Sequence, residues 1–167
     1  MIDQNKSNPN PVPSECKNPS ETHSMFMLPV RVYYEDTDAG GVVYHSNYIN
    51  YFERARTEWL RQLGYELDEL AENEQLIFVV RALNCEYLLP AKFNDELFVS
   101  AEIIEMGRTS ILFEQKVMRA AKAEDKKTNS ACVVLAKGNV TVVSVDAQKF
   151  KPKRLPNYIM ETIRTLL

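Results

Sequence analysis

The sequence has few of the residue types and runs that would place it in a specialised class of protein. Its three cysteines, Cys16, Cys85 and Cys132, form no CxxC pair, so we expect reduced thiols instead of a zinc site or a disulfide framework. No apolar run approaches the roughly 18 residues of a membrane-spanning helix, and the N-terminal segment lacks the apolar stretch of a secretory signal. A cytoplasmic protein with no stable membrane insertion is therefore expected.

Motifs for several common chemistries are absent as well. The chain has no GxSxG nucleophile elbow, no Walker A loop and no GxGxxG turn, and its net charge of −3 gives no indication of nucleic-acid binding. Of the two histidines, His23 lies in a polar N-terminal segment. Only His45 then remains to bind a metal with Asp36 and Asp38, at a spacing that matches no familiar site. We expect no metal and no bound cofactor.

Composition divides the chain into a tail and one domain. Residues 1–24 are rich in Asn, Pro and Ser and nearly free of large apolar side chains. Such a segment cannot bury enough surface to offset the entropy lost on ordering, so we predict a disordered tail. Residues 25–167 are long enough for a single domain with a hydrophobic core.

The start of this domain reads as a strand followed by a long helix. In "PVRVYYE", alternation predicts a strand that turns Val30, Val32 and Tyr34 towards the core. Apolar residues then recur at spacings of three and four across residues 48–63, which predicts one amphipathic helix packed against a sheet. Ser46 or Asn47 is expected to cap this helix, and Gly64 to end it.

The rest of the domain reads as strands. After an acidic connection, strand-like segments lie at residues 76–89, 96–106, 110–120 and 131–145, and a short helix ends the chain. The connections are too short for parallel crossovers. The fold class is therefore α+β, a five-stranded antiparallel sheet wrapped around one long central helix. One helix covers only one face of the sheet, so we expect a partner subunit on the other face.

The stretch "YYEDTDAGGVVYHSNY", residues 33–48, carries the most unusual chemistry. It places Asp38 and His45 in a glycine-containing loop between the strand and the start of the helix, where free backbone N–H groups favour negative charge. These N–H groups could stabilise an oxyanion while an Asp acts as general base or nucleophile, which suits hydrolysis of an activated ester. An ordinary turn would use the same residue types, so the loop alone leaves both interpretations open.

Residues 31–64, "RVYYEDTDAGGVVYHSNYINYFERARTEWLRQLG", closely resemble the signature of YbgC-type acyl-CoA thioesterases. These proteins belong to the 4-hydroxybenzoyl-CoA thioesterase branch of the hotdog-fold superfamily. The resemblance extends more loosely through "FVVRALNCEYLLPAKFNDEL" and "MGRTSILFEQKV" to "KPKRLP". It implies a hotdog fold and two hotdogs paired with their active sites at the shared interface, often as a tetramer of two dimers.

The resemblance also implies roles for individual residues. Asp38 matches the catalytic carboxylate, as nucleophile or as general base. His45 matches a position used in the family; we expect its backbone N–H to polarise the thioester carbonyl and its imidazole to orient water or substrate. Tyr34 matches a tyrosine linked to the active site. Asp36 is expected to fix the loop by hydrogen bonds.

A coenzyme A substrate brings phosphates, which an acidic protein must meet with local positive charge. The candidates are Arg108 first, then Arg81 and Lys92, and the run Lys149, Lys151, Lys153 and Arg154. Trp59, Phe78 and Met106 are candidates to line the acyl chain's path. The family context associates such proteins with acyl-carrier protein, phospholipid synthesis and the Tol-Pal system.

Two other functions compete with thioester hydrolysis. A hydroxyacyl-thioester dehydratase would share the fold, but its His-Phe-Pro-Gly type motif is missing. A non-catalytic module that binds acyl thioesters or acyl-carrier protein, within a Tol-Pal or phospholipid-synthesis assembly, is the second.

Overall fold

An antiparallel sheet organises the chain in the computed structural model, which describes residues 26–123, 125 and 131–166. Its five strands are ordered β1-β3-β4-β5-β2. Their bounds are β1 Phe26–Arg31, β2 Leu76–Tyr87, β3 Glu96–Met106, β4 Ser110–Ala120 and β5 Cys132–Asp146. Every pairing is antiparallel, as predicted. The predicted tail, residues 1–24, lies outside the described residues.

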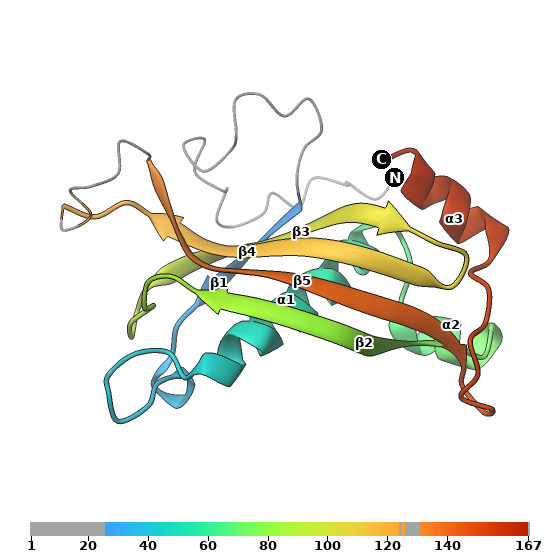
Figure 1. Ribbon diagram of the computed structural model, residues 1–167, viewed down its shortest axis with the longest axis horizontal. Helices are drawn as coiled ribbons and strands as arrows, with labels where there is room; N and C mark the ends of the chain where they lie inside the picture. Colours follow the sequence, from blue (N-terminus) through green and yellow to red (C-terminus); the bar gives the residue numbers. More distant parts are fainter. Residues whose placement is uncertain (1–25, 124, 126–130, 167) are drawn as a thin grey trace, which may run out of the picture.

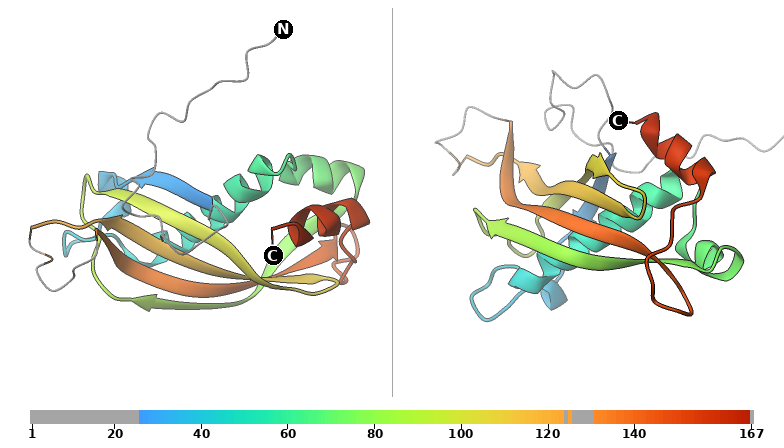
Figure 2. Two further views of the ribbon diagram at one scale, coloured as in Figure 1. Left: turned by 90° about the horizontal axis from the view of Figure 1, so that it is seen from above. Right: turned by 45° about the vertical axis from the view of Figure 1, so that its right-hand side comes forward.

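Helix α1 (His45–Gln62) lies along one face of the curved sheet (Figures 1 and 2). The predicted apolar stripe is the side that it buries, with Tyr51, Phe52 and Ala55 fully inaccessible to solvent. The class α+β with a long central helix is confirmed. Two shorter helices, α2 (Leu67–Asn73) and α3 (Asn157–Arg164), complete the described part of the chain. Helix α2 was not predicted, because its seven residues bury only Leu70 and so give little periodicity.

The start of α1 differs from the prediction, whereas its end agrees with it. The helix starts at His45 after the N-cap residue Tyr44, so neither Ser46 nor Asn47 is the cap, and the prediction of the start is wrong by two or three residues. Its end is as predicted, because Gly64 adopts a φ of 89° and donates its N–H to the Arg61 carbonyl at 2.9 Å. This left-handed conformation is the one that glycine accepts without strain.

Strand β1 is shorter than predicted. It ends at Arg31, and residues Tyr34–Asp36 form the 3₁₀ turn η2. The Asp36 carboxylate accepts the Tyr33 backbone N–H at 2.8 Å, a local hydrogen bond that competes with a continued strand. Tyr34 is therefore 76% exposed, and the expectation that it faces the core is wrong.

The cysteines also differ from the prediction. Cys132, the first residue of β5, is disulfide-bonded, whereas Cys85 in β2 is a free thiol. The expectation of three reduced thiols is therefore wrong for Cys132, because spacing along a chain does not tell which thiols meet in space.

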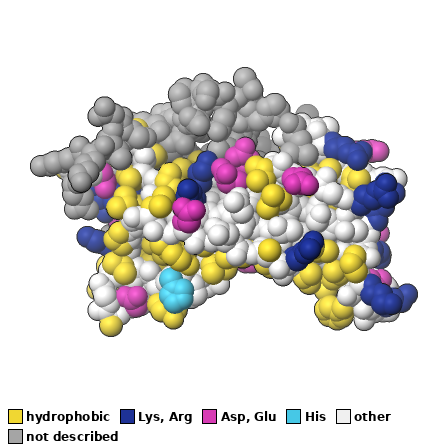
Figure 3. All heavy atoms as spheres, viewed as in Figure 1, with side chains coloured by type: hydrophobic (Ala, Val, Ile, Leu, Met, Phe, Trp, Pro, Cys, Tyr) yellow, Lys and Arg dark blue, Asp and Glu magenta, His cyan; other side chains and the backbone are white. Residues whose placement is uncertain are grey.

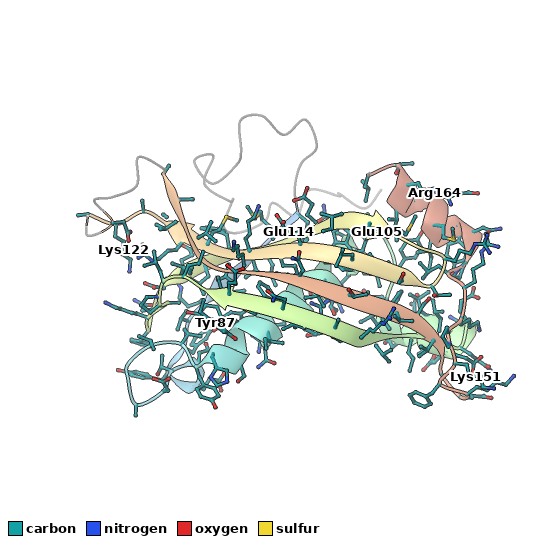
Figure 4. The ribbon with its side chains drawn as sticks, viewed as in Figure 1. Tyr87, Glu105, Glu114, Lys122, Lys151 and Arg164 are labelled. Atoms are coloured by element: carbon teal, nitrogen blue, oxygen red, sulfur yellow. The ribbon has the colours of Figure 1, made fainter. Side chains whose placement is uncertain are left out.

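Both edges of the sheet, β1 and β2, are unpaired on their outer sides within the described residues, and the face opposite α1 is not covered by a helix. Strand β2 pairs only with β5, so its other edge presents unpaired backbone groups over much of its 12 residues. The face opposite α1 carries charged side chains such as Glu105 and Glu114 (Figures 3 and 4). No helix among the residues that the structure describes is both long and apolar enough to span a membrane.

Candidate active site

The loop between η2 and α1 is a tight hairpin. Asp38 donates its backbone N–H to the Val42 carbonyl at 3.0 Å and accepts the Gly41 N–H on its own carbonyl at 2.9 Å. Gly41 takes a φ of 72°, a conformation that most other residues avoid. Val42 in turn forms an isolated bridge with Lys92 in the β2–β3 connection. The hairpin is therefore anchored to a neighbouring segment, which fixes the position of Asp38.

The Asp38 carboxylate has one oxygen engaged and one available. Its Oδ1 accepts the Gly40 backbone N–H at 2.7 Å. Its Oδ2 forms no hydrogen bond with the residues that the structure describes. The first contact orients the side chain, and the second oxygen is left for a water molecule or a substrate atom.

Asp36 holds the hairpin to the start of the helix through its backbone carbonyl, whereas its predicted side-chain hydrogen bond goes to Tyr33 in the preceding turn. Besides its side-chain bond to Tyr33, its carbonyl accepts the Tyr44 backbone N–H at 2.8 Å and the Asn47 amide at 2.9 Å. Beneath it lies Tyr51, which is fully buried and close to the Asp36 carboxylate. Burial, and then the charge of Asp36, raise the pKa of Tyr51, so this phenol stays neutral.

The start of α1 presents its free backbone donors beside this loop. His45 is the first residue of the helix, and its backbone N–H forms no hydrogen bond within the described residues. Its ring lies 4.3 Å from that of Tyr44, centroid to centroid, and its carbonyl accepts the Tyr87 hydroxyl at 3.1 Å. Such a helix start suits a developing negative charge.

Asp38 and His45 line one cavity of about 330 Å³. Its other walls come from the hairpin, α1 and the segment after β2: Val42, Val43, Tyr48, Tyr87, Leu88, Leu89 and Pro90. Figure 4 places Tyr87 at the end of β2 near the start of α1. Burial raises the pKa of Tyr87 to about 12, so its phenol is a hydrogen-bond donor at neutral pH and not a base.

Tyr87 and the apolar residues that follow it were not predicted to belong to the site. These residues lie at the end of a strand predicted only as sheet, some 40 positions from the hairpin. The run "YLLP", in which large apolar side chains precede a proline, was the available signal. Tyr87, Leu88 and Leu89 are all at least 41% exposed, which is unusual for such side chains.

The other predicted site residues are placed at different distances from this cavity. Tyr34 does not line it and stacks instead on Phe93, with ring centroids 4.0 Å apart. Lys92 lies beside the hairpin through its bridge to Val42. Arg81 is exposed at the β-bulge in the middle of β2.

Arg108 lies far from Asp38 within one chain. Arg108 follows β3 in the chain, whereas Lys92, which lies beside the hairpin, precedes β3. The strand has 11 residues, which at about 3.3 Å per residue separate its ends by roughly 35 Å. Figure 1 shows the β3–β4 turn and the start of α1 at opposite ends of the molecule. One chain therefore does not bring Arg108 to the cavity.

A second, apolar cavity of about 140 Å³ lies between α1 and the sheet. Trp59 and Phe78 line it, together with Phe113, but Met106 does not. Arg56 borders it, and the Arg56 guanidinium donates to the buried Gln115 amide oxygen at 2.8 Å. Among the described residues no group of three or more His, Cys, Asp or Glu side chains is arranged to hold a metal ion.

A curved antiparallel sheet around one helix, with an Asp hairpin at the helix start, defines a hotdog protein of the thioesterase class. The family model for the thioesterase superfamily matches residues 40–125. The chain is 46% identical over 134 residues to the acyl-CoA thioesterase YbgC of Haemophilus influenzae, covering 80% of this chain and 90% of that protein. It is 43% identical over 137 residues to an acyl-CoA thioester hydrolase YbgC of Escherichia coli, covering 82% of this chain and 94% of that protein.

A solved structure supports the same assignment. A probable thioesterase from Bartonella henselae superposes with a TM-score of 0.69 at 30% sequence identity, covering 80% of this chain and all of that one. The chain belongs to the thioesterase superfamily and, within it, to the YbgC-type thioesterases. The expected hotdog fold is thereby confirmed.

Proposed function

We propose that this protein hydrolyses acyl-CoA thioesters to a free carboxylic acid and coenzyme A. The observation that carries the proposal is the shared cavity of Asp38 and His45, which combines a carboxylate oxygen without a protein partner and a free helix-start N–H. The printed names of the YbgC relatives, acyl-CoA thioesterase and thioester hydrolase, support the same substrate class.

In the proposed reaction, the thioester carbonyl oxygen points at the backbone N–H of His45. Asp38 Oδ2 takes a proton from water, and the water oxygen attacks the carbonyl carbon. The negative charge that develops on the carbonyl oxygen is stabilised by the helix start. Collapse of the intermediate breaks the carbon–sulfur bond, and the coenzyme A thiolate leaves and takes up a proton. As nucleophile, Asp38 would instead attack the carbonyl carbon itself, and water would then hydrolyse the anhydride.

The neighbouring side chains have supporting roles in the proposal. The His45 imidazole, exposed at the mouth of the cavity, orients water or substrate. Tyr34 acts from outside the cavity, where its stack on Phe93 braces the segment before the hairpin. Lys92 is the cation best placed to meet a coenzyme A phosphate, while Arg81 and Arg108 need a second subunit to approach the same cavity.

The test is release of free thiol from short, long and aromatic acyl-CoAs by the wild type and Asp38→Asn. The amide oxygen of Asn still accepts the Gly40 N–H, so the hairpin is retained while the basic oxygen is lost. We expect kcat to fall at least about a hundredfold, as for removal of a general base, with the melting temperature unchanged within about 2 °C.

Asp68→Asn is the matched control. Asp68 is an exposed Asp in α2 whose Oδ1 likewise accepts a backbone N–H, that of Glu69 at 3.0 Å. This variant should keep full activity. Equal activity of Asp38→Asn and wild type would refute the catalytic role of Asp38. No thiol release by the wild type on any acyl-CoA would instead favour a non-catalytic binding module or an acyl-carrier-protein substrate.

The proposal includes a cytoplasmic homo-oligomer, a dimer or a homotetramer. The exposed apolar side chains around the cavity, among them Tyr44, Tyr87 and Leu88, support a partner subunit there. The unpaired edge of β2 offers backbone groups for the same contact. Acyl-carrier protein as an alternative carrier, and association with the Tol-Pal system, rest on the family resemblance alone.

A further inference from the structure

The end of the molecule opposite the Asp38 hairpin carries a basic loop. Lys149, Phe150, Lys151 and Arg154 connect β5 to α3, and we call these four residues the basic tip. Arg108 adjoins them, because its carbonyl accepts the Leu155 N–H at 3.2 Å. Figure 3 shows Lys and Arg side chains gathered at this end, and Figure 4 labels Lys151 there. A protein with a net charge of −3 therefore concentrates positive charge at one place.

The basic tip is held in a defined shape. The Asp146 carboxylate accepts the backbone N–H groups of Gln148 at 3.0 Å and Lys149 at 2.8 Å, and its carbonyl accepts that of Phe150 at 2.9 Å. The Asp146 N–H in turn donates to the Lys151 carbonyl at 2.9 Å. These four bonds close a compact turn, so its outward side chains are presented by a fixed backbone.

Phe150 is the unusual residue of this turn. It is 69% exposed, and its φ is 51°, a backbone conformation that bulky residues rarely adopt. Glycine or asparagine would fit this position at lower cost. The protein thus holds a large, mostly exposed apolar ring between two lysines, at a position where the backbone is strained.

The charges beside Phe150 are not held in salt bridges within the described residues, although the charge of Lys149 helps to lower the pKa of Asp146. Among the residues that the structure describes, Lys149, Lys151, Arg154 and Arg108 form no ion pair. Lys153 differs, because it bonds to the Glu74 carbonyl and lies 4.0 Å from the Asp146 carboxylate, so we leave it out of the basic tip. These cations are therefore free to meet an external anionic surface.

We propose that the basic tip is a peripheral docking surface for an anionic phospholipid bilayer. Phe150 inserts its ring at the level of the headgroups, and Lys149, Lys151 and Arg154 lie against lipid phosphates. An exposed aromatic ring flanked by lysines matches the chemistry of the membrane interface, which is apolar beneath and negatively charged above. The tip is a projecting turn (Figure 1), so it fits a broad surface better than a peptide that needs a groove. This docking does not depend on the proposed hydrolysis.

The test is co-sedimentation of the full chain with vesicles. Vesicles of phosphatidylcholine with about one third phosphatidylglycerol should bind the protein at low salt, and pure phosphatidylcholine vesicles should not. Lys149→Gln with Lys151→Gln should weaken binding about 25-fold, since each lysine near such a surface contributes about fivefold. Phe150→Asn, which suits the positive φ, should weaken binding about tenfold. Binding should also fall in 0.5 M salt.

The matched control is Lys116→Gln with Lys137→Gln. These two lysines lie opposite each other on the neighbouring strands β4 and β5, away from the basic tip. This control changes the net charge equally and should leave binding unchanged. Melting temperatures confirm that each variant folds. Equal binding to both kinds of vesicle, no binding to either, or full binding by the double Lys149 and Lys151 variant would overturn the proposal. Failure to bind any vesicle would make an acidic protein the expected partner of the tip.

Discussion

The substitution Gln115→Leu tests the polar network buried between α1 and the sheet. Gln115 is completely inaccessible to solvent and lies on β4 beneath the helix. Its amide Nε2 donates to the carbonyls of Phe52 at 3.0 Å and Ser100 at 3.2 Å. Its Oε1 accepts the Arg56 guanidinium at 2.8 Å. Leucine has a similar size, so the change removes three hydrogen bonds and leaves little empty space.

The expected loss in the free energy of unfolding follows from these three hydrogen bonds. The bond to the charged Arg56 contributes about 1.5–3 kcal/mol, and each neutral bond about 0.5–1.5 kcal/mol. Arg56 also loses its partner in a partly apolar setting, where burial lowers its pKa. After allowance for the apolar gain of leucine, we expect the free energy of unfolding to fall by about 3 kcal/mol. For a chain of this size the melting temperature should drop by about 6–12 °C.

Urea unfolding at a fixed protein concentration measures this loss, and a double-mutant cycle with Arg56→Met isolates the charged bond. Each single variant leaves a buried group unpaired, whereas the double variant removes both partners. The double variant should therefore be more stable than the sum of the two losses predicts, by about 1–2 kcal/mol. A loss below about 0.5 kcal/mol for Gln115→Leu, or additive losses, would refute the view that this network joins the helix to the sheet.

Three further substitutions test separate features. Gly138→Ala would place a Cβ 2.5 Å from the Asn84 carbonyl oxygen on the paired strand β2 and 2.9 Å from the Phe52 ring of α1. Differential scanning calorimetry should therefore show that the free energy of unfolding falls by about 1–3 kcal/mol. Gly40→Ala would place a Cβ 3.0 Å from Asp38 Oδ1; we expect lower kcat in the thiol-release assay with little change in melting temperature. The Arg119 guanidinium lowers the pKa of Asp125 to about 2. The unfolded carboxyl titrates near 3.8, so the stability from this pair should be present above about pH 4 and lost as the pH falls towards 2. Urea midpoints of wild type and Asp125→Asn should converge over that range.

The sequence by itself determined the secondary structure of the sheet and the long helix. Strands β3 and β4 coincide with their predicted segments, because both are bounded by clear turn residues and alternate buried and exposed positions. The end of α1 was predictable for a similar reason, since Gly64 is a residue that accepts a positive φ. The hairpin around Asp38 could be singled out because its acids and glycines are unusual in a chain with five glycines.

Tertiary structure alone decided which residues share the cavity and which do not. Tyr87 reaches His45 only because the end of β2 lies beside the start of α1, a contact across 42 positions that no local pattern encodes. Tyr34 lies in a 3₁₀ turn and not in the predicted strand, because the Asp36 side chain, three residues along the chain, accepts the Tyr33 N–H. Arg108, the first choice for the phosphates, is separated from Asp38 by the length of β3, and Cys132 is bonded despite its isolation in the sequence. Local periodicity fixes which face of an element is buried, whereas the meeting of distant side chains depends on how the elements pack.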